Sequence, residues 1–370
     1  MSERVVILTP ANPASHGGVE RVVREMAHRL ARHYTVEVVC AGSEEKKMSG
    51  EYDTTVVKSR LGEYGSVIPL VGAVVRAKPA LIYAHTVSSV VPLVTRMAKS
   101  EVNCKVVLHP HYHQSARTFV NGLVRRLYDP LVVSSAVNSA NAIIANSKSE
   151  LLELRSIFHT KQSVFVLHNG VDIEAIRNAP PVKVDTDKIP LLWVSRLEAY
   201  KNPIFALEVL RWLRHKYHLY LIGEGPLEGA LRQKISQTRL DKEVSLLGPV
   251  RDGDLYGWYK SANAFLHFSS SESFGMTCIE ALAAGTPVLA NDDGHGLTET
   301  IDLFPSAIHR CSVNQETPEA VAKKVENCAN SKPVNVDLRM FDWDLIGEKL
   351  YRIIESTMSE RNVVEPNRGF

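Results

Sequence analysis

Two glutamates separated by a short turn are the residues of this chain whose types and spacing most suggest chemistry. Glu272 and Glu280 bound the segment ESFGMTCIE. Residues 264–268 before it have the apolar composition of a buried strand, and residues 276–284 have helical spacing. The turn between them therefore follows the carboxyl end of a strand, where open α/β sheets bind their ligands.

The turn and the start of this predicted helix suit a sugar nucleotide. The backbone amides of Phe274, Gly275 and Met276 would point out of the helix start, where the partial positive charge favours a phosphate. Gly275 would let the backbone approach a ligand without an intervening side chain. Glu280 shares a helix face with Met276, and its carboxylate can accept hydrogen bonds from two vicinal hydroxyls of a ribose or hexose.

A purely structural interpretation of both glutamates is also open. Glu272 could complement the charge of the helix start, and Glu280 could form an ordinary ion pair. Because an isolated motif carries a real false-positive risk, the rest of the chain must decide.

Basic residues and a glycine follow two other predicted strands of this half. Arg196 and Lys201 come after residues 191–194, and Gly223 comes after residues 219–222. The forked donors of an arginine and the point charge of a lysine could neutralise a diphosphate. A pair of surface cations is the alternative.

Gly17 and Gly18 precede a helix predicted over residues 19–30 near the amino terminus. Paired glycines allow a close backbone approach to a ligand, and an anion could sit at the helix start. A plain loop explains the pair as well.

Three histidines follow another predicted strand, residues 106–108. His109, His111 and His113 alternate in HPHYH, so in an extended backbone they share a face and could bind a transition metal. Because no carboxylate or cysteine lies nearby, we expect no metal there and instead expect one histidine to contact a substrate.

The elements that must position these residues are strands alternating with helices along the whole chain. This alternation predicts an α/β fold with mainly parallel sheets and helices on both faces. The further strands are expected at residues 5–8, 36–39, 56–57, 81–84, 142–145, 164–167, 244–247 and 288–290.

A change of composition divides the chain into two predicted domains. Residues 178–190, NAPPVKVDTDKIP, contain three prolines and few large apolar groups, as is typical of a linker. We therefore expect an acceptor-binding domain at residues 1–178 and a nucleotide-binding domain at residues 179–345. A final helix and tail are expected at residues 346–370.

The composition is that of an ordinary soluble globular protein. The chain has 370 residues, of which 45% are apolar and 23% charged, and its net charge is +2. Residues 1–180 hold 21 Lys+Arg against 15 Asp+Glu, whereas the remainder holds 22 against 26. The amino-terminal half is therefore the likelier partner of an anionic lipid surface or a phosphorylated acceptor, and no nucleic-acid partner is expected.

The cysteines and the apolar runs bear on the compartment. The five cysteines have no paired spacing, which argues against disulfides and a structural zinc site. No leader or membrane-spanning run is apparent, so we expect a cytoplasmic protein or a peripheral one on the cytosolic membrane face. Residues 117–127, RTFVNGLVRRL, could contact a membrane as a basic amphipathic helix or form a solvated face of their own domain.

These pieces, in this order, resemble the retaining glycosyltransferases of family 4, which have the GT-B fold of two facing Rossmann-like domains. The strongest match is E-x7-E, formed by Glu272 and Glu280. Supporting matches are GGVERV, ANSKSE, NGVD, SRLEAYKN, GEGPL and the closing segment FDWDLIGEKLYRII, whose last helix crosses back to the amino-terminal domain in that fold.

The resemblance implies a role for each matched residue. Arg196 and Lys201 would hold the diphosphate of a nucleotide-sugar donor, in a loop region that includes Gly223, and Glu280 would hold its ribose. Glu272, with amides near Phe274 and Gly275, would hold the transferred sugar. Gly17 and Gly18 would let the acceptor-side loop approach the donor. The pocket histidine corresponds to one in HPHYH, for which His111 is favoured over His109.

The resemblance also implies a reaction without a cofactor. A hexose would pass from a UDP- or GDP-sugar to a hydroxyl of a glycan, lipid-linked or small-molecule acceptor, with retention and without an obligatory metal. Fixed cations and amides would stabilise the leaving diphosphate, and domain closure would exclude water. The rival hypotheses are a nucleotide-sugar 2-epimerase and a non-catalytic nucleotide-sugar-binding protein.

Overall fold

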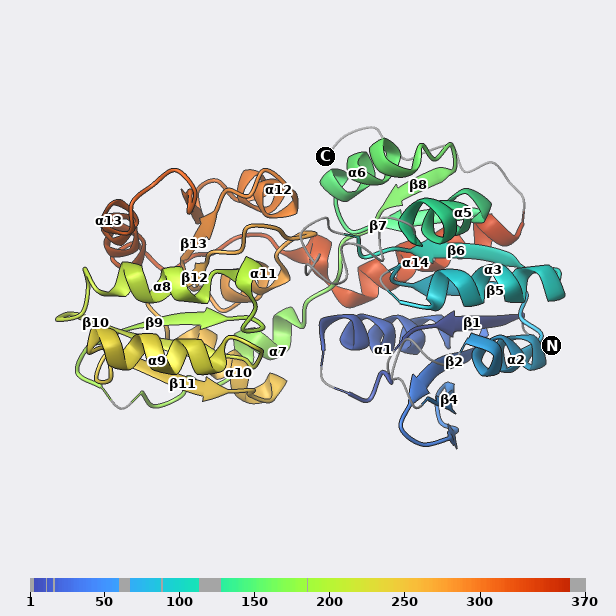
Figure 1. Ribbon diagram of the computed structural model, residues 1–370, viewed down its shortest axis with the longest axis horizontal. Coiled ribbons are helices and arrows are strands. Elements are labelled where there is room, and N and C mark those ends of the chain that lie inside the picture. The colour runs from blue at the N-terminus through green and yellow to red at the C-terminus, as the bar shows by residue number, and fades with distance from the viewer. Residues whose placement is uncertain are drawn as a thin grey trace. The chain divides into compact units, whose positions relative to one another are not determined.

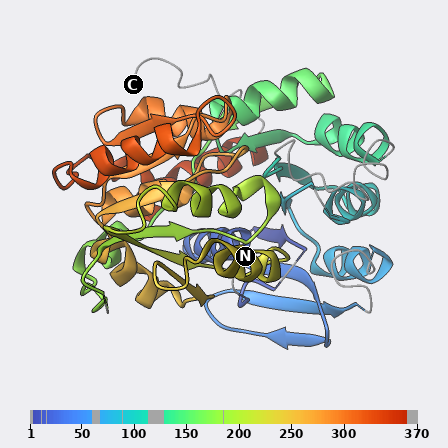
Figure 2. The ribbon, with the colours of Figure 1, turned by 60° about the vertical axis from the view of Figure 1, so that its left-hand side comes forward.

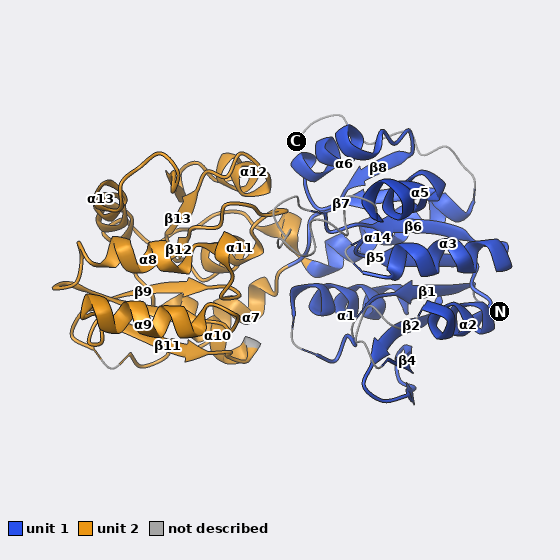
Figure 3. Ribbon diagram, in the orientation of Figure 1, with its two compact units in different colours: residues 1–112, 117–170, 343–370 blue, residues 113–116, 171–342 orange. Residues whose placement is uncertain are grey.

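The chain forms two compact units in a computed structural model that describes residues 3–10, 12–15, 17–59, 67–87, 89–112, 128–184 and 186–359. Unit 1 comprises residues 1–112, 117–170 and 343–370, and unit 2 comprises residues 113–116 and 171–342 (Figure 3). Each unit is built on its own sheet.

The sheet of unit 1 has eight strands in the order β3-β4-β2-β1-β5-β6-β7-β8. Its paired strands are parallel, apart from β3, which runs antiparallel to β4. The strands are β1 (Arg4–Leu8), β2 (Thr35–Gly42), β3 (Lys46–Met48), β4 (Asp53–Lys58), β5 (Leu81–His85), β6 (Lys105–His109), β7 (Ala142–Ala145) and β8 (Ser163–Val166).

Both faces of this sheet are buried, because alternate strand residues point into two separate cores. In β1, Val6 and Leu8 join one apolar cluster, whereas Val5 and Ile7 join the other. The first cluster lies under α2 (Val67–Ala77), α3 (Val91–Glu101), α5 (Ser134–Ser139) and α6 (Lys148–Phe158). The second lies under α1 (Gly18–Leu30) and α14 (Trp343–Met358).

The sheet of unit 2 has six parallel strands in the order β11-β10-β9-β12-β13-β14. They are β9 (Ile189–Val194), β10 (Tyr217–Ile222), β11 (Val244–Gly248), β12 (Ala264–His267), β13 (Val288–Asn291) and β14 (Ile308–Cys311). In β9, Leu191 and Trp193 face one core and Leu192 and Val194 the other, so this sheet is also covered on both faces.

Two groups of helices cover the sheet of unit 2 (Figure 1 and Figure 2). On one face lie α7 (Ile173–Asn178), α10 (Asp252–Ser261), α11 (Met276–Ala283) and α12 (Gly296–Leu303). On the other lie α8 (Pro203–Leu210), α9 (Glu228–Thr238) and α13 (Pro318–Ala329). The predicted α/β class, with mainly parallel sheets and helices on both faces, is confirmed.

The last helix packs against the first helix of the chain within unit 1. The Arg29 guanidinium lies 5.7 Å from the ring centre of Trp343, and its Nε lies 3.1 Å from a carboxylate oxygen of Asp344. A side chain at Gly170 would collide with Trp343, since a Cβ there would lie 2.3 Å from its ring. The apolar residues Ile346 and Leu350 complete the buried face of the amphipathic helix α14.

The boundaries between the units differ from those expected from composition. The chain leaves unit 1 after Gly170 and returns at Trp343. The proline-rich residues 178–190 belong to unit 2, because Val182 N–H donates to Gly257 O (3.4 Å) and Ser261 donates to Val182 O (2.8 Å). Prolines here shape a segment that packs on α10 and do not mark where the units join.

Two strands were not predicted from the sequence, and both lie at sheet edges. β3 is a short charged strand, KKM, and β14 reads IHRC, so neither has a continuous apolar run. The five cysteines are free and buried. Within the described ranges, every helix is too short or too polar to cross a lipid bilayer.

Candidate functional site

The predicted site residues of unit 2 gather where the strand order of its sheet reverses. β9 is the first strand in sequence, β10 pairs on one side of it, and β12 pairs on the other. Lys201 ends the short 3-10 helix Ala199–Lys201 after β9, and Glu272 lies in the loop after β12. Such a reversal leaves a crevice at the carboxyl ends of the strands, which is the usual ligand site of open α/β sheets.

Lys201 and Glu272 form a largely buried ion pair at this point. The Lys201 Nζ contacts Glu272 Oε1, and the two side chains are only 13% and 15% exposed. His267, at the end of β12, places Nε2 3.1 Å from the same oxygen. Glu272 N–H donates to Asp293 Oδ2 (2.9 Å), so the loop that carries the glutamate is fixed from a second side.

The charges of this cluster hold each other ionised. Burial by itself would raise the pKa of Glu272, but the charge of Lys201 and the nearby His267 more than offset it, so the pKa is below its usual range. Burial works against the charge of Lys201 too, yet Glu272 raises the pKa of that ammonium above its usual value. The carboxyl end of this sheet therefore carries a charged lysine beside a charged glutamate.

The start of α11 presents backbone amides next to this cluster. Gly275 precedes the helix with φ +85, a left-handed conformation that favours glycine, and a Cβ there would lie 2.7 Å from Leu297. The first amides of a helix have no partner within it, so they can bind an anion. Phe274 contributes only backbone, because its ring is buried 5.6 Å from that of Phe341. Met276 is half-buried.

Glu280 lies inside α11 and is oriented by a tyrosine. It is 7% exposed, and Tyr259 of α10 donates a hydrogen bond of 2.9 Å to its Oε2. A carboxylate held in this way is placed to accept a hydroxyl hydrogen bond.

Arg196 and Gly223 lie in adjoining loops after β9 and β10. The Arg196 side chain is 74% exposed and pairs with Glu198 at 2.5 Å, in contrast to the buried Lys201. Gly223 has φ +136, and a Cβ there would lie 1.8 Å from Ser195 O. Glycine at this position lets the two loops pack, which fixes the backbone that carries Arg196.

Two aspartates that follow β13, Asp292 and Asp293, have hydrogen-bond partners within the protein. Asp292 accepts from Thr298 (2.6 Å) and pairs with Arg310 (2.7 Å). Asp293 accepts from the backbone of His295 (2.8 Å) as well as from Glu272. These bonds order the loop before α12.

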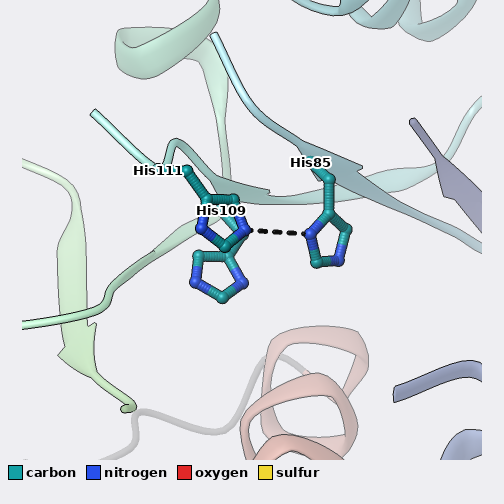
Figure 4. A group of neighbouring side chains, drawn as sticks. All are labelled: His85, His109 and His111. Atoms are coloured by element: carbon teal, nitrogen blue, oxygen red, sulfur yellow. Dashed lines mark hydrogen bonds between the residues drawn. The ribbon is translucent and has the colours of Figure 1, made fainter. Parts of the chain in front are cut away.

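In unit 1, the predicted histidines lie at the carboxyl end of the sheet and join a histidine that was not predicted. His85 ends β5 and is the register partner of His109, which ends β6. His111 stacks on His109 with ring centres 4.0 Å apart, and its Nε2 lies 3.2 Å from His85 Nδ1 (Figure 4). His113 lies outside the described residues, as do residues 117–127.

The backbone around this histidine cluster is strained. His111 has φ +47 and Thr86 has φ +66, although neither is glycine. A β-branched residue in this region is a true outlier, and such conformations cost about 1–3 kcal/mol each. Thr86 N–H donates to His109 O (2.8 Å), which ties the two strained segments together. Strain of this kind gathers at functional sites.

His109 and His85 are buried and neutral at physiological pH. Burial lowers the pKa of His109 to about 4, and burial followed by the proximity of His109 places the pKa of His85 well below its usual value. Both ring nitrogens of His109 have partners, Tyr83 at 2.8 Å and Asn146 at 3.0 Å. His111 is half-buried, so it is better placed than His109 to contact a ligand.

The three histidines are also close enough to hold a metal ion. Each has a ring nitrogen within 4.8 Å of the others. Imidazole suits zinc, copper, iron and nickel. Several of these nitrogens already have hydrogen-bond partners. A ring nitrogen that carries a proton cannot bind a metal, so the proton positions decide whether a metal fits.

Gly17 and Gly18 lie where α1 begins, as predicted. Gly17 caps the helix, and a Cβ there would lie 2.0 Å from the Glu20 carboxylate, whereas Gly18 is surrounded by open space within 4 Å. The Glu20 carboxylate complements the helix start in the way an anion would.

Four functional candidates were missed in the sequence: His85, His267, Tyr259 and Glu150. Of these four, only Glu150 lies in a sequence motif from which its role could have been predicted. Ser147 and Glu150 form an S-x-x-E capping box before α6, which predicts that the glutamate side chain turns back toward the helix start. The structure agrees that Ser147 caps the helix by accepting from Glu150 N–H.

Comparison with known proteins gives two family matches that together span most of the chain. The profile of Glycosyltransferase Family 4 matches residues 16–175, and that of Glycosyl transferases group 1 matches residues 174–340. A D-inositol 3-phosphate glycosyltransferase of Pseudarthrobacter chlorophenolicus is 27% identical over 236 residues, which are 55% of this chain and 56% of that protein. The chain spans about half the length of the curated relatives it matches.

Solved structures share the fold over nearly their whole length. Sucrose-phosphate synthase from Thermosynechococcus elongatus has a TM-score of 0.79 at 17% identity and covers 97% of this chain and 100% of its own. HepE of Anabaena, solved with UDP-glucose, has a TM-score of 0.74 at 19% identity, with 95% and 99% covered.

Proposed function

Since the chain belongs to the family 4 glycosyltransferases, a family with the GT-B fold, we propose that it moves a hexose from a nucleoside-diphosphate sugar to an acceptor hydroxyl with retention of configuration. The observation that carries the proposal is the buried Lys201–Glu272 pair beside the start of α11. A cation, an anion and the amino-terminal end of a helix come together where the sheet of unit 2 reverses its strand order.

The donor diphosphate is assigned to Lys201 and to the first amides of α11. Both are electropositive, and both are fixed before the ligand arrives. Arg196 is exposed on a loop and has a long side chain, so it reaches the diphosphate by exchanging Glu198 for the phosphate oxygens. Glu280, oriented by Tyr259, accepts from the ribose hydroxyls.

Glu272 is assigned to the transferred sugar. Its carboxylate stays ionised, so it accepts hydrogen bonds from sugar hydroxyls and donates none. Phosphate oxygens would compete with Glu272 for Lys201, which leaves the carboxylate oxygens available to the sugar. We assign His111 of unit 1 to the same reaction as a substrate contact.

The reaction is driven by stabilisation of the leaving group. Breaking the bond between the anomeric carbon and the phosphate oxygen leaves a nucleoside diphosphate with one more negative charge. Lys201 and the amides at the start of α11 meet this charge without reorganisation, which lowers the barrier. The acceptor hydroxyl attacks from the face that the diphosphate leaves, and a diphosphate oxygen takes its proton. The new bond then has the configuration of the old one.

Thermal unfolding with nucleoside diphosphates tests donor binding. UDP is the first probe because HepE was solved with UDP-glucose, and GDP and ADP are the comparison set. A ligand at 100 times its dissociation constant stabilises the fold by about 2.7 kcal/mol, which is readily detected. If none of the three stabilises the chain, the donor assignment is overturned.

Product analysis tests transfer and its stereochemistry. The acceptor set includes an inositol phosphate, because relatives carry the name D-inositol 3-phosphate glycosyltransferase, together with unphosphorylated polyols and glycans. Proton NMR of the product reports the anomeric configuration directly. An inverted product would contradict retention, and conversion of the donor sugar without an acceptor would favour the epimerase hypothesis.

A further inference from the structure

We propose that Asn146 and Glu150 are positioning residues that keep the ring proton of His111 on Nε2. Asn146 follows β7, and Glu150 lies in the first turn of α6. Neither side chain needs to touch a substrate, because both act through the histidine cluster. The consequence for catalysis rests on the proposed function, whereas the state of the ring does not.

Glu150 is buried and surrounded by N–H groups. It is 2% exposed, and its Oε1 accepts from Tyr112 N–H at 2.6 Å. Its Oε2 accepts from the Asn146 backbone N–H at 2.6 Å and from the Asn146 side chain at 2.9 Å. Burial raises the pKa of Glu150 to about 7, so above this pH the carboxylate is ionised and can only accept hydrogen bonds. Asn146 must therefore turn its amide nitrogen, and not its oxygen, toward Glu150.

The orientation of Asn146 determines the proton position on His109. With its nitrogen on Glu150, Asn146 presents Oδ1 to His109 Nε2 at 3.0 Å. That ring nitrogen must carry the proton, since it faces an acceptor. His109 Nδ1 then accepts from the Tyr83 hydroxyl at 2.8 Å. Every group in this part of the network has a complementary partner.

The second hydrogen of the Asn146 amide determines the proton position on His111. Asn146 Nδ2 lies 3.1 Å from His111 Nδ1. One of its two hydrogens is donated to Glu150, so the other remains for His111. His111 Nδ1 must therefore accept, so the single proton of the neutral ring is on Nε2. This Nε2–H points toward His85 Nδ1 at 3.2 Å. The proton positions thus follow from one carboxylate.

The backbone and the neighbouring rings prevent His111 from turning away. Its φ of +47 and its stacking on His109 at 4.0 Å leave the ring little freedom. The proton on Nε2 faces His85 Nδ1 at 3.2 Å, and a sugar or phosphate oxygen could take this hydrogen bond in exchange for His85, whereas a donor group could not. Asn146 and Glu150 thereby select what His111 can bind.

The same arrangement opposes a transition metal on His111 Nε2. A neutral imidazole that binds a metal through Nε2 carries its proton on Nδ1. That proton would face the Asn146 N–H, so two donors would meet at 3.1 Å. The cluster of His85, His109 and His111 is therefore organised to hold protons.

Nitrogen-15 NMR of histidine-labelled protein tests the inference, because protonated and unprotonated ring nitrogens have well-separated shifts. Spectra are recorded at pH 8, and His111→Gln and His109→Gln assign two of the 14 histidines. We expect His111 to show a protonated Nε2 and an unprotonated Nδ1 in the unaltered chain. A protonated Nδ1 on His111 would overturn the inference.

Two variants test whether Asn146 and Glu150 cause this state. In Asn146→Ala and in Glu150→Gln, His111 should populate both tautomers, and kcat should fall by up to about a hundredfold with little change in the donor KM. Ser147→Ala is the matched control, since it removes the cap of α6 beside Asn146. It should lower the melting temperature without changing the His111 signals.

The outcomes separate the inference from the proposed function. If both variants keep His111 fully protonated on Nε2, the positioning role is wrong even when activity falls. If the signals behave as expected but no donor is turned over, the inference stands and the proposed function fails. If either variant does not fold, the other variant and the unaltered chain still decide the proton position.

Discussion

Glu150 in unit 1 is buried and Glu272 in unit 2 is largely buried, and both lie beside the carboxyl ends of their sheets, yet their surroundings differ in charge. Glu150 accepts only from uncharged N–H groups, and burial raises its pKa to about 7. Glu272 is subject to the same effect of burial, but Lys201 and His267 bring its pKa below the usual range.

This difference shows how one residue type can serve two purposes. A carboxylate among neutral donors directs protons, because its acceptor oxygens decide how an amide and two imidazoles turn. A carboxylate paired with a lysine maintains a fixed dipole in a crevice, ready for a ligand that is itself charged. The first arrangement favours recognition by hydrogen bonds, and the second favours stabilisation of a leaving anion.

The largest expected effect is that of Lys201→Ala. It removes the cation of the crevice and leaves Glu272 buried with His267 alone, so the free energy of unfolding should fall by roughly 3–5 kcal/mol. Nucleoside-diphosphate affinity and transfer should both be lost. Urea unfolding and calorimetric titration with UDP measure the two effects.

A second lysine pair provides the control for Lys201→Ala. Lys188 pairs with Glu243 at 2.7 Å in unit 2, with side chains 26% and 11% exposed. Lys188→Ala should lower stability without changing UDP affinity. Equal loss of affinity in both variants would mean that Lys201 acts through the fold and not at the donor.

Glu272→Gln distinguishes the role of Glu272 in sugar transfer from its effect on diphosphate binding. The amide keeps the size of the side chain but loses the charge, so transfer should fall by at least about 10²–10³-fold. UDP affinity should stay unchanged or rise, because Lys201 no longer has a competing anion. Steady-state kinetics and titration with UDP check the two parts, and unchanged turnover would remove Glu272 from the reaction.

The strands and helices, and the placement of Glu272 and Glu280 around the start of α11, could be predicted because they depend on local patterns. The strand, turn and helix around Gly275 follow from apolar runs, and Glu272 and Glu280 were identified from their spacing. His85 and His267 were not, since each ends an apolar strand with no motif around it. The partners of Glu150 lie 38 and 4 residues away, at Tyr112 and Asn146, and only folded strands bring them together.

The pH dependence of stability should differ between the two carboxylates. The folded-state pKa of Glu150 is about 7, raised from 4.5, so between these values the folded chain binds more protons than the unfolded chain. Stability contributed by this group is complete below pH 4.5 and is lost as pH rises through 7. The loss amounts to about 3 kcal/mol. Glu272 has the opposite sign, and its contribution is lost only as pH falls below 4.5.

Comparison with a Glu150 variant separates the contribution of Glu150 to the free energy of unfolding from that of other titrating groups. His85 and His109 have lowered pKa values and destabilise the fold as pH falls. The pH dependence of the unaltered chain alone therefore cannot be assigned to Glu150. Urea unfolding of the unaltered chain and of Glu150→Gln is compared at several points between pH 4.5 and 7.5. The difference between the two should change with pH over this range, and a constant difference would contradict the raised pKa.

The smallest expected effect is that of metal removal, which should leave both regions unchanged. In unit 2, Lys201 supplies the positive charge that a metal would bring to a diphosphate, and the nearby Asp292 and Asp293 are bonded to Thr298 and backbone groups. In unit 1, the Asn146 N–H opposes a metal on His111. Transfer rates measured with and without EDTA should therefore agree. A loss that Mn²⁺ or Zn²⁺ restores would show that one of the two clusters uses a metal. His111→Gln and Asp293→Asn would identify which, because each removes one possible metal ligand from its own cluster.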